Sequence, residues 1–195
     1  MTSKEAKAMA KATLSDKRYQ HTANVKKMAV KLAQKYGEDP EKAALAAWLH
    51  DLAKEKPRDE LLRILGENAI MADNAEKRPP QVWHGICAAI LAQKEWGVDD
   101  PEILNAVACH TTGRPGMTKL DEILFLADMT SAERDWSGVE ALRRLEMKDL
   151  DAAMLSGLDQ TIRFVKQGHK PVDPMSAAAY HDLQDRYGKG NKINE

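Results

Sequence analysis

The sequence has 195 residues, of which 43% are hydrophobic and 30% charged, and its formal net charge is -1. This composition is typical of one soluble globular domain, and the near-neutral charge argues against nucleic acid or a membrane surface as a partner. No apolar run approaches the roughly 20 residues of a membrane span. The N-terminus lacks the hydrophobic stretch of a signal peptide, and Cys87 and Cys109 make no disulfide framework. We therefore expect a cytoplasmic protein with free thiols.

Almost every segment of the chain has the pattern of a helix, beginning with a short one over 3–13. Ser15 is a predicted N-cap for a longer helix over 16–37, whose apolar positions recur at helical spacing. His21 lies on the inward stripe of this helix. On its own, such a residue is more often a core histidine with a hydrogen bond than a metal ligand.

The stretch over 42–54 is the most informative part of the chain. Asp39 and Pro40 are predicted to begin a nearly apolar, buried helix here. Its end carries three polar side chains, namely His50, Asp51 and Lys54. Buried carboxylates and imidazoles are costly unless they are paired or bind a metal. We interpret His50 and Asp51 as metal ligands and Lys54 as a cation one helical turn beyond His50. The alternative is that the aspartate only orients the histidine.

Two short helices are predicted next, over 59–65 and 67–75, with Gly66 ending the first. The basic pair Lys77-Arg78 lies in a loop, either as a solvated turn or facing an anionic substrate. An apolar helix then runs over 82–97.

Two further histidines stand at predicted helix ends. His84 lies in the first turn of the 82–97 helix, where free N–H groups favour anions or where the imidazole caps the helix. A helix that begins at Asp100-Pro101 ends in His110. Thr111, Thr112 and Gly113 follow it, which adds hydroxyl donors and a flexible backbone beside a possible ligand.

Asp128 is a second buried acid. Thr118 is a predicted cap for a helix over 119–129, whose centre is almost wholly apolar until Asp128. An aspartate near the negative end of a helix is unfavourable without a partner. Arg134 follows and has three candidate partners: Glu133, Asp135 or a phosphate.

The remaining helices are predicted over 139–144, 149–166 and 175–187. His169 and His181 lie in polar surroundings and are expected at the surface. Trp96 and Trp136 fit either a homodimer contact or burial against the core. The expected organisation is an N-terminal helical extension, a main domain and a flexible tail, over 1–15, 16–187 and 188–195.

Together these side chains suggest one chemistry. The six potential ligands are His21, His50, Asp51, His84, His110 and Asp128. Mixed imidazole and carboxylate ligation suits Fe, Mn, Zn or Ni better than Mg or Ca. Lys54, Arg134 and a helix N-terminus favour a phosphate ligand. A divalent ion lowers the pKa of bound water to about 7, so the residues predict metal-dependent hydrolysis of a phosphate ester or anhydride.

The order of these motifs resembles a known family. His21, His50-Asp51 and Asp128 follow one another as in the HD superfamily of metal-dependent phosphohydrolases. Four longer blocks are similar to its bacterial symmetrical bis(5'-nucleosyl)-tetraphosphatase branch, namely Leu49–Lys54, Trp83–Gly85, His110–Gly113 and Leu124–Asp128. The resemblance covers roughly residues 21–174.

This resemblance implies an all-α, single-domain HD fold and an enzyme that hydrolyses diadenosine tetraphosphate at the central phosphoanhydride, giving two ADP. The substrate partner is then a dinucleoside polyphosphate, with no nucleic acid and no membrane. The implied cofactor is a divalent transition metal, foremost iron, with Mn, Co or Ni as alternatives. The implied metal ligands are His21, His50, Asp51 and Asp128.

The resemblance also implies which residues act on the substrate. The catalytic group is Asp51, Lys54, His84 and His110, with His84 as either an acid or a second-metal ligand. The substrate-binding group is Asp51, Lys54, His84, His110, Thr111, Asp128, Arg134 and Ser176. Ser176 stands for the family's usual Thr, and Tyr180 and His181 stand where Arg and Asn are usual. Met129-Thr130-Ser131 replaces residues that are usually acidic.

Two other interpretations stay open. One is another HD-type nucleotidase or phosphodiesterase, acting on nucleoside monophosphates or cyclic nucleotides. The Gly-Tyr-Pro signature of the cyclic dinucleotide branch is absent near residues 113–116, which disfavours that branch. The other is a non-catalytic, metal-containing nucleotide-binding module, in which the ion is structural.

Overall fold

The structure is a computed structural model that describes residues 1–69 and 75–191 of the chain. The α-helices, in chain order, are α1 (Ser3–Thr13), α2 (Asp16–Tyr36), α3 (Pro40–Leu49), α4 (Arg58–Glu67), α6 (Trp83–Lys94), α7 (Pro101–Cys109), α8 (Lys119–Thr130), α9 (Val139–Glu146), α10 (Leu150–Gln167) and α11 (Pro174–Asn191). Two 3-10 turns, η1 (Ala75–Lys77) and η2 (Pro80–Val82), precede α6. The described residues contain no strand, which confirms the predicted all-α class.

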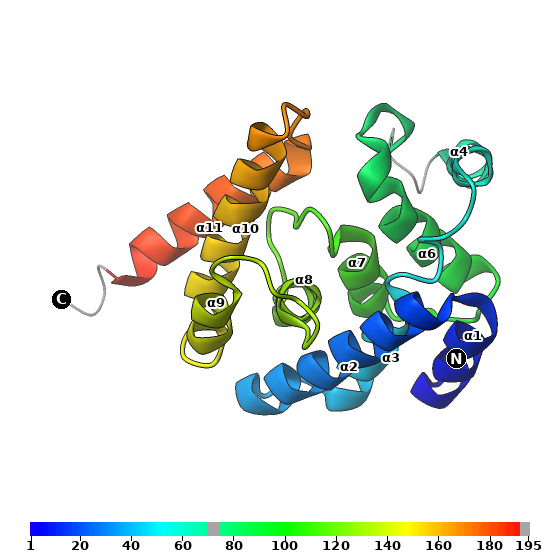
Figure 1. Ribbon diagram of the computed structural model, residues 1–195, viewed down its shortest axis with the longest axis horizontal. Coiled ribbons are helices and arrows are strands. Elements are labelled where there is room, and N and C mark those ends of the chain that lie inside the picture. The colour runs from blue at the N-terminus through cyan, green and yellow to red at the C-terminus, as the bar shows by residue number, and fades with distance from the viewer. Residues whose placement is uncertain (70–74, 192–195) are drawn as a thin grey trace.

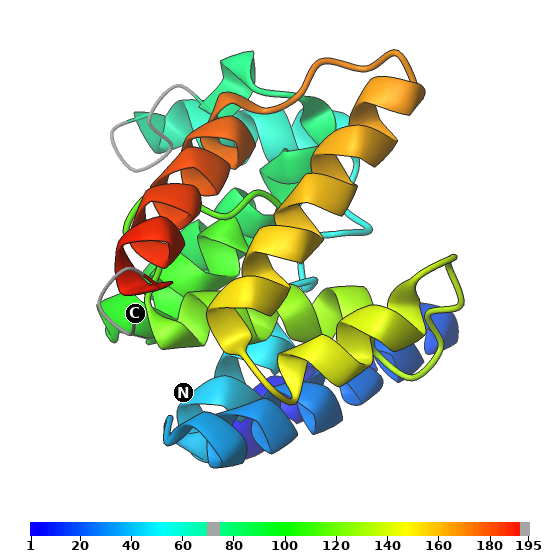
Figure 2. The same cartoon turned by 90° about the vertical axis from the view of Figure 1, so that its left-hand side faces the viewer.

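The helices pack around α7 and α8 at the centre of the molecule (Figure 1). Helices α2 and α3 pack on one another, and both contact α8. Helices α4 and α6 lie on one side of this centre, and α10 and α11 on the other (Figure 1). The last two run side by side, as the view turned by 90° shows (Figure 2). The middle of α8, Leu120–Ala127, is buried throughout.

In α2 and α8, capping residues stand where the sequence predicts. The Ser15 hydroxyl accepts a hydrogen bond from the Arg18 N–H, and Gly37 closes α2 in the left-handed conformation, with φ of 69°. Thr118 and Asp121 form a capping box at the start of α8. Because these caps satisfy backbone groups within a few residues, they are readable from local sequence.

The predicted helix over 42–54 is wrong at its C-terminal end, because α3 stops at Leu49. His50 is its C-cap, and the chain continues in tighter turns: the Leu52 N–H donates to the Leu49 carbonyl over 3.1 Å, and the Lys54 N–H donates to the Asp51 carbonyl over 2.9 Å. Lys54 therefore does not follow His50 on one helical face. The turns bring Asp51 to the interior instead, where its side chain is 3% exposed.

The predicted stop at Gly66 is also wrong. Helix α4 passes through Gly66 and ends at Glu67, where Asn68 is the cap and its side-chain amide donates to the Ile64 carbonyl. A glycine costs a helix only about 1 kcal/mol, which one such cap offsets. The helix predicted over 67–75 falls largely on residues 70–74, which lie outside the described residues.

Helix α11 extends beyond the predicted end at Tyr187, to Asn191. None of the described helices is both long enough and apolar enough to cross a membrane.

Candidate metal centre

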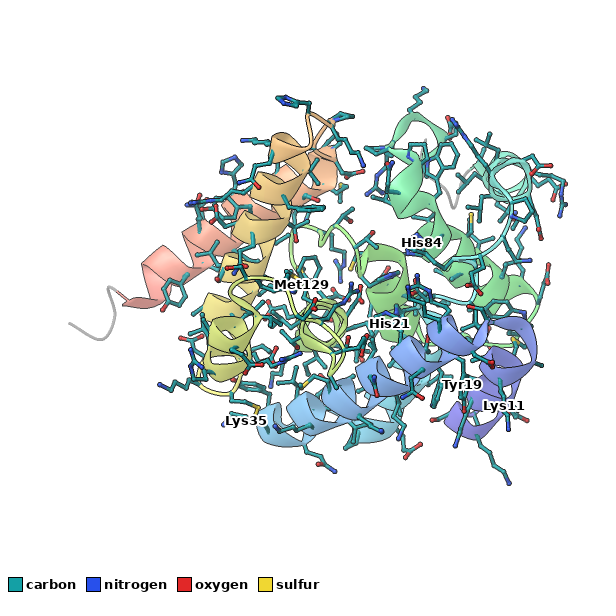
Figure 3. All side chains as sticks on the ribbon, viewed as in Figure 1. Lys11, Tyr19, His21, Lys35, His84 and Met129 are labelled. Atoms are coloured by element: carbon teal, nitrogen blue, oxygen red, sulfur yellow. The ribbon has the colours of Figure 1, made fainter. Side chains whose placement is uncertain are left out.

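The polar side chains that the sequence singles out come from distant parts of the chain to one buried cluster. His21 lies on α2, His50 caps α3, and Asp128 lies near the end of α8. His84 is in the first turn of α6, and Figure 3 labels it together with His21. His110 is the C-cap of α7, and Asp51 follows α3 directly.

Asp51 stands at the middle of this cluster and uses both carboxylate oxygens. Its Oδ2 lies 3.6 Å from His21 Nε2 and 3.4 Å from His50 Nε2. Its Oδ1 lies 3.2 Å from His84 Nε2 and 3.9 Å from His110 Nε2. One carboxylate thus faces two pairs of imidazoles.

Three overlapping groups have geometry suited to a metal ion. They are His21, His50 and Asp51; His50, His110 and Asp128; and Asp51, His84 and His110. Within each group the ligand atoms lie within 4.8 Å of one another. Asp128, a member of the second group, also lies close to a residue of the first, since its Oδ1 is 3.1 Å from His21 Nε2. The cluster therefore offers an ion several combinations of nitrogen and oxygen ligands.

Hydrogen bonds on the far side of the rings turn the imidazoles toward the cluster. Nδ1 of His50 lies 2.7 Å from the Ala47 carbonyl, and Nδ1 of His110 lies 2.7 Å from the Val107 carbonyl. A carbonyl only accepts, so Nδ1 carries the proton in both rings and Nε2 is left to accept or ligate. This is how ligating histidines are usually oriented.

The position of His50 shows that the cluster fits a cation. Its Nε2 is fully buried and makes no hydrogen bond with any described residue. Burial lowers the pKa of His50, but the charges of Asp51 and Asp128 outweigh it and raise that pKa overall. The site therefore favours positive charge at Nε2. A divalent ion meets that demand, and the donor set is one that transition metals accept.

The other groups have the protonation states that ligands need. Burial lowers the pKa of His110 to about 3, and burial likewise lowers the pKa of His84. Burial opposes ionisation of both acids. His50, His84 and His110 nevertheless hold the pKa of Asp51 well below the usual range, and His21, His50 and Arg134 do the same for the pKa of Asp128. Neutral imidazoles and ionised carboxylates are the forms that bind metals.

Three cations surround the cluster. Lys54 Nζ lies 3.3 Å from His84 Nε2, and burial lowers the pKa of this lysine. Arg134 donates to Asp128 Oδ1 over 2.6 Å, so its partner is neither of the predicted acids. Arg18 donates to Asp51 Oδ2 over 2.8 Å and was not predicted. Its position three residues before His21, on the same face of α2, is the signal that would have found it.

Glu133 is a second residue whose role at the site was not predicted from the sequence: it is a hydrogen-bond partner of His21. Its Oε1 accepts from His21 Nδ1 and from the Ser131 hydroxyl, and its Oε2 accepts from Asn24 over 2.7 Å. Burial raises the pKa of Glu133, but these bonds outweigh it and lower the pKa to about 2. A carboxylate behind a histidine both fixes the ring and strengthens it as a ligand.

Arg143 holds the loop that carries Glu133 and Arg134. Its guanidinium donates to the carbonyls of Thr130, Ser131 and Arg134, over 2.9, 2.7 and 2.9 Å. The loop that follows α8 is thereby tied to α9.

Thr111 and Ser176 line a cavity of about 80 Å³ whose lining includes neither Asp51 nor Asp128. The Thr111 hydroxyl is buried without a hydrogen-bond partner among the described residues. Arg78 does not lie in a solvated turn: it donates twice to Asp173, over 2.8 and 2.9 Å, at the edge of the same cavity. Because Thr111 follows His110 directly, this cavity adjoins the cluster.

Several aromatic residues and histidines lie outside the cluster. Trp96 and Trp136 are partly buried and pack against the core. His169 and His181 are exposed, as predicted. Tyr180 packs against the core, where its ring lies 6.0 Å from that of His181.

A helical fold that gathers histidines and aspartates from separate helices into one buried cluster defines a class, that of divalent-metal hydrolases. The HD domain family matches residues 18–133, which contain all the clustered side chains. The symmetrical bis(5'-nucleosyl)-tetraphosphatase of Bacillus subtilis is 37% identical over 94% of this chain and 98% of its own length. The protein of that name from Halalkalibacterium halodurans is 37% identical over 92% and 95%.

A solved structure is similar over nearly the whole chain. It is described as a predicted HD superfamily hydrolase involved in NAD metabolism from Clostridium acetobutylicum. It has a TM-score of 0.89 and 35% identity, and the match covers 94% of this chain and 97% of that one. The chain therefore belongs to the HD domain family and, within it, to the symmetrical bis(5'-nucleosyl)-tetraphosphatases.

Proposed function

We propose that this protein is a metal-dependent phosphohydrolase that cleaves diadenosine tetraphosphate at its central phosphoanhydride and releases two ADP. The observation that carries this proposal is the Asp51 carboxylate, which faces imidazoles with both oxygens while Lys54 and Arg134 stand at the same cluster. Ligands and cations together suit a divalent ion and a polyphosphate. The names of the relatives from Bacillus and Halalkalibacterium support the substrate.

The ligands proposed for the ion are His21, His50, Asp51 and Asp128. We propose iron, as the resemblance to the HD family implies, with Mn, Co and Ni as alternatives; mixed imidazole and carboxylate ligands suit transition metals of this kind. When bound, the ion polarises a phosphoryl oxygen and lowers the pKa of water. Elemental analysis of the purified protein distinguishes these metals.

The other site residues are proposed to hold the polyphosphate and its nucleosides. Lys54 and Arg134 neutralise phosphate oxygens, since both cations lie at the cluster and Arg134 is 39% exposed. Thr111 and Ser176 are proposed to contact a nucleoside at the cavity that they line.

His84 and His110 share Asp51 Oδ1, and their Nε2 atoms lie 3.2 Å apart. Two proposals fit this geometry: the pair completes a second metal position, or it contacts phosphate while His84 Nε2 delivers a proton. A His84→Ala variant separates them. Loss of one equivalent of bound metal supports the first, and unchanged metal content with reduced turnover supports the second.

Product identification tests the function. Diadenosine tetraphosphate is incubated with the metal-loaded protein, and the nucleotides are separated by chromatography. We expect ADP as the sole product. Release of AMP with ATP would place the cleavage at another bond, and hydrolysis of AMP or of a cyclic nucleotide in place of diadenosine tetraphosphate would favour the other HD-type activities.

We further propose that the protein acts in the cytoplasm, where the two buried, unpaired thiols of Cys87 and Cys109 are stable. Residues 16–187 are proposed as the hydrolase domain, with residues 1–15 as an extension whose helix α1 packs on α3.

A further inference from the structure

A groove of about 610 Å³ lies beside the metal centre, and of its lining residues only Arg134 takes part in the proposed function. Its lining includes Met129, Arg134, Trp136, Gln160, Phe164 and Gln167. Arg134 lines the groove and also donates to Asp128 at the cluster, and Met129, labelled in Figure 3, follows Asp128 in α8. The groove therefore opens directly next to a proposed metal ligand.

Phe164 is the most unusual side chain in this groove. It is 77% exposed, and the next exposed large hydrophobic side chain among the described residues, Leu62, is 37% exposed. Such exposure forgoes the stabilisation that burying the ring would give. Gln160 and Gln167 lie four residues before and three residues after Phe164, so all three share one face of α10.

Trp136 also lines the groove and is held in place. Its Nε1 donates to the Met129 carbonyl over 3.0 Å. Gly138 lies against the indole ring: its φ is 106°, and a Cβ there would stand 3.2 Å from the ring. A side chain at residue 138 would be strained and would crowd the indole. The aromatic wall is therefore fixed before any ligand arrives.

The chemistry of the groove matches a nucleoside attached to phosphates. Two aromatic side chains line the groove, Trp136 and Phe164. Stacking of a base on an aromatic ring contributes strongly to binding wherever nucleic-acid bases meet protein. The amides of Gln160 and Gln167 can donate to and accept from base edges. Arg134 and Arg163 add positive charge for the phosphates. Thr161 of α10 lines both this groove and the cavity at Thr111 and Ser176, so the two spaces adjoin along one helix.

We propose that this groove, between Trp136 and Phe164, binds the second nucleoside of the dinucleoside tetraphosphate. The proposal rests on the proposed function. A substrate cut at its centre carries one nucleoside on each side of the reacting phosphates. The cavity at Thr111 and Ser176 serves one of them, and the aromatic groove serves the other. Phe164 and Trp136 are then specificity residues that favour two-nucleoside substrates over nucleotides with the same phosphate chain.

The test compares diadenosine tetraphosphate with adenosine 5'-tetraphosphate, which has the same phosphates and one nucleoside. We expect the wild-type KM to be about tenfold lower for the two-nucleoside substrate, as one stacked base implies. Phe164→Ala should abolish this preference with little change in kcat. Phe164→Trp should retain the preference. Leu62→Ala is the control: it shortens an exposed hydrophobic side chain on a different helix, α4, and should behave as wild type.

An unchanged KM ratio in Phe164→Ala would overturn the proposal. If, in addition, Phe164→Ala changes the sedimentation of the protein, the groove is instead a contact between copies of the chain. The wild-type product separates this outcome from failure of the proposed function: ADP release with an unaffected ratio rejects only the groove, whereas no ADP release rejects the activity. Because Phe164 is exposed, its replacement is not expected to impair folding.

Discussion

His21 illustrates how a single residue is made into a ligand by its neighbours. Its Nε2 faces Asp51 and Asp128, and its Nδ1 is engaged by Glu133. The sequence indicates the histidine because it interrupts an apolar stripe. The Glu133 contact spans 112 positions in the sequence, and no local pattern encodes it. Ligands that stand out against apolar helices are predictable, whereas their hydrogen-bond partners on polar loops are not.

Replacing Glu133 by glutamine tests this support. The variant keeps the size of the side chain but removes the charge behind His21. Loss of such a partner typically lowers metal affinity or activity about 10- to 100-fold, and we expect a loss in that range. Isothermal titration with a divalent metal and ADP release measure it. Asp135→Asn, a change at an exposed neighbouring acid, is the control, and equal effects of the two variants would contradict the role of Glu133.

Glu146 is a buried acid outside the centre. Its Oε2 accepts from the Thr130 hydroxyl over 2.9 Å, and its Oε1 has no partner among the described residues. Burial raises its pKa from 4.5 to about 7, against the lowering effects of Thr130 and Arg143. The folded state thus favours the neutral form. The folded protein loses stability as the pH rises from below 4.5 through about 7.

Glu146→Gln should remove this pH dependence, because glutamine stays neutral. We expect the free energy of unfolding of the variant, relative to that of wild type, to increase by roughly 1–3 kcal/mol from pH 5 to pH 8. Urea denaturation at the two pH values measures the difference. A stability difference that is the same at both values would show that Glu146 does not titrate in this range.

At the scale of elements, helix starts were more predictable than helix ends. Ser15, Asp39 and Thr118 cap helices through bonds to residues within three positions, so their signal is local. Helix α3 instead ends where His50 and Asp51 turn into the cluster. That ending depends on α2, α6, α7 and α8, which bring the other cluster residues, and the apolar composition of the stretch gave no sign of it.

The loop after α8 depends on another element, α9, through Arg143. Arg143→Met should leave the carbonyls of Thr130, Ser131 and Arg134 without their shared donor. Unpaired groups of this kind cost ~1–3 kcal/mol, so we expect a lower melting temperature, and lower activity because Glu133 and Arg134 lose their positions. Arg144→Met, at the exposed neighbour, should change stability by less than about 0.5 kcal/mol. Similar melting temperatures for both variants would contradict this role of Arg143.

At the scale of the whole molecule, the apolar core and the metal centre are distinct. Ile123–Ala127 of α8 pack in the core, and Asp128 follows at the end of the same buried helix. The all-α class follows from helical periodicity, which each segment carries by itself. The convergence of His21, Asp51 and Asp128 depends on the packing of α2, α3 and α8. The sequence indicated it in two ways, by the placing of acids and histidines on apolar helices and by the order of motifs within the family.

The central claim is that Asp51 joins the metal ligands into one catalytic site within a core that folds without it. The most direct measurement compares wild type and Asp51→Asn for bound metal, for ADP released from diadenosine tetraphosphate, and for helical content by circular dichroism. We predict that the variant keeps its helical content but loses bound metal, and that its rate of ADP release falls at least 100-fold, as loss of an essential ligand implies. An Asp51→Asn protein that releases ADP at the wild-type rate would contradict the account.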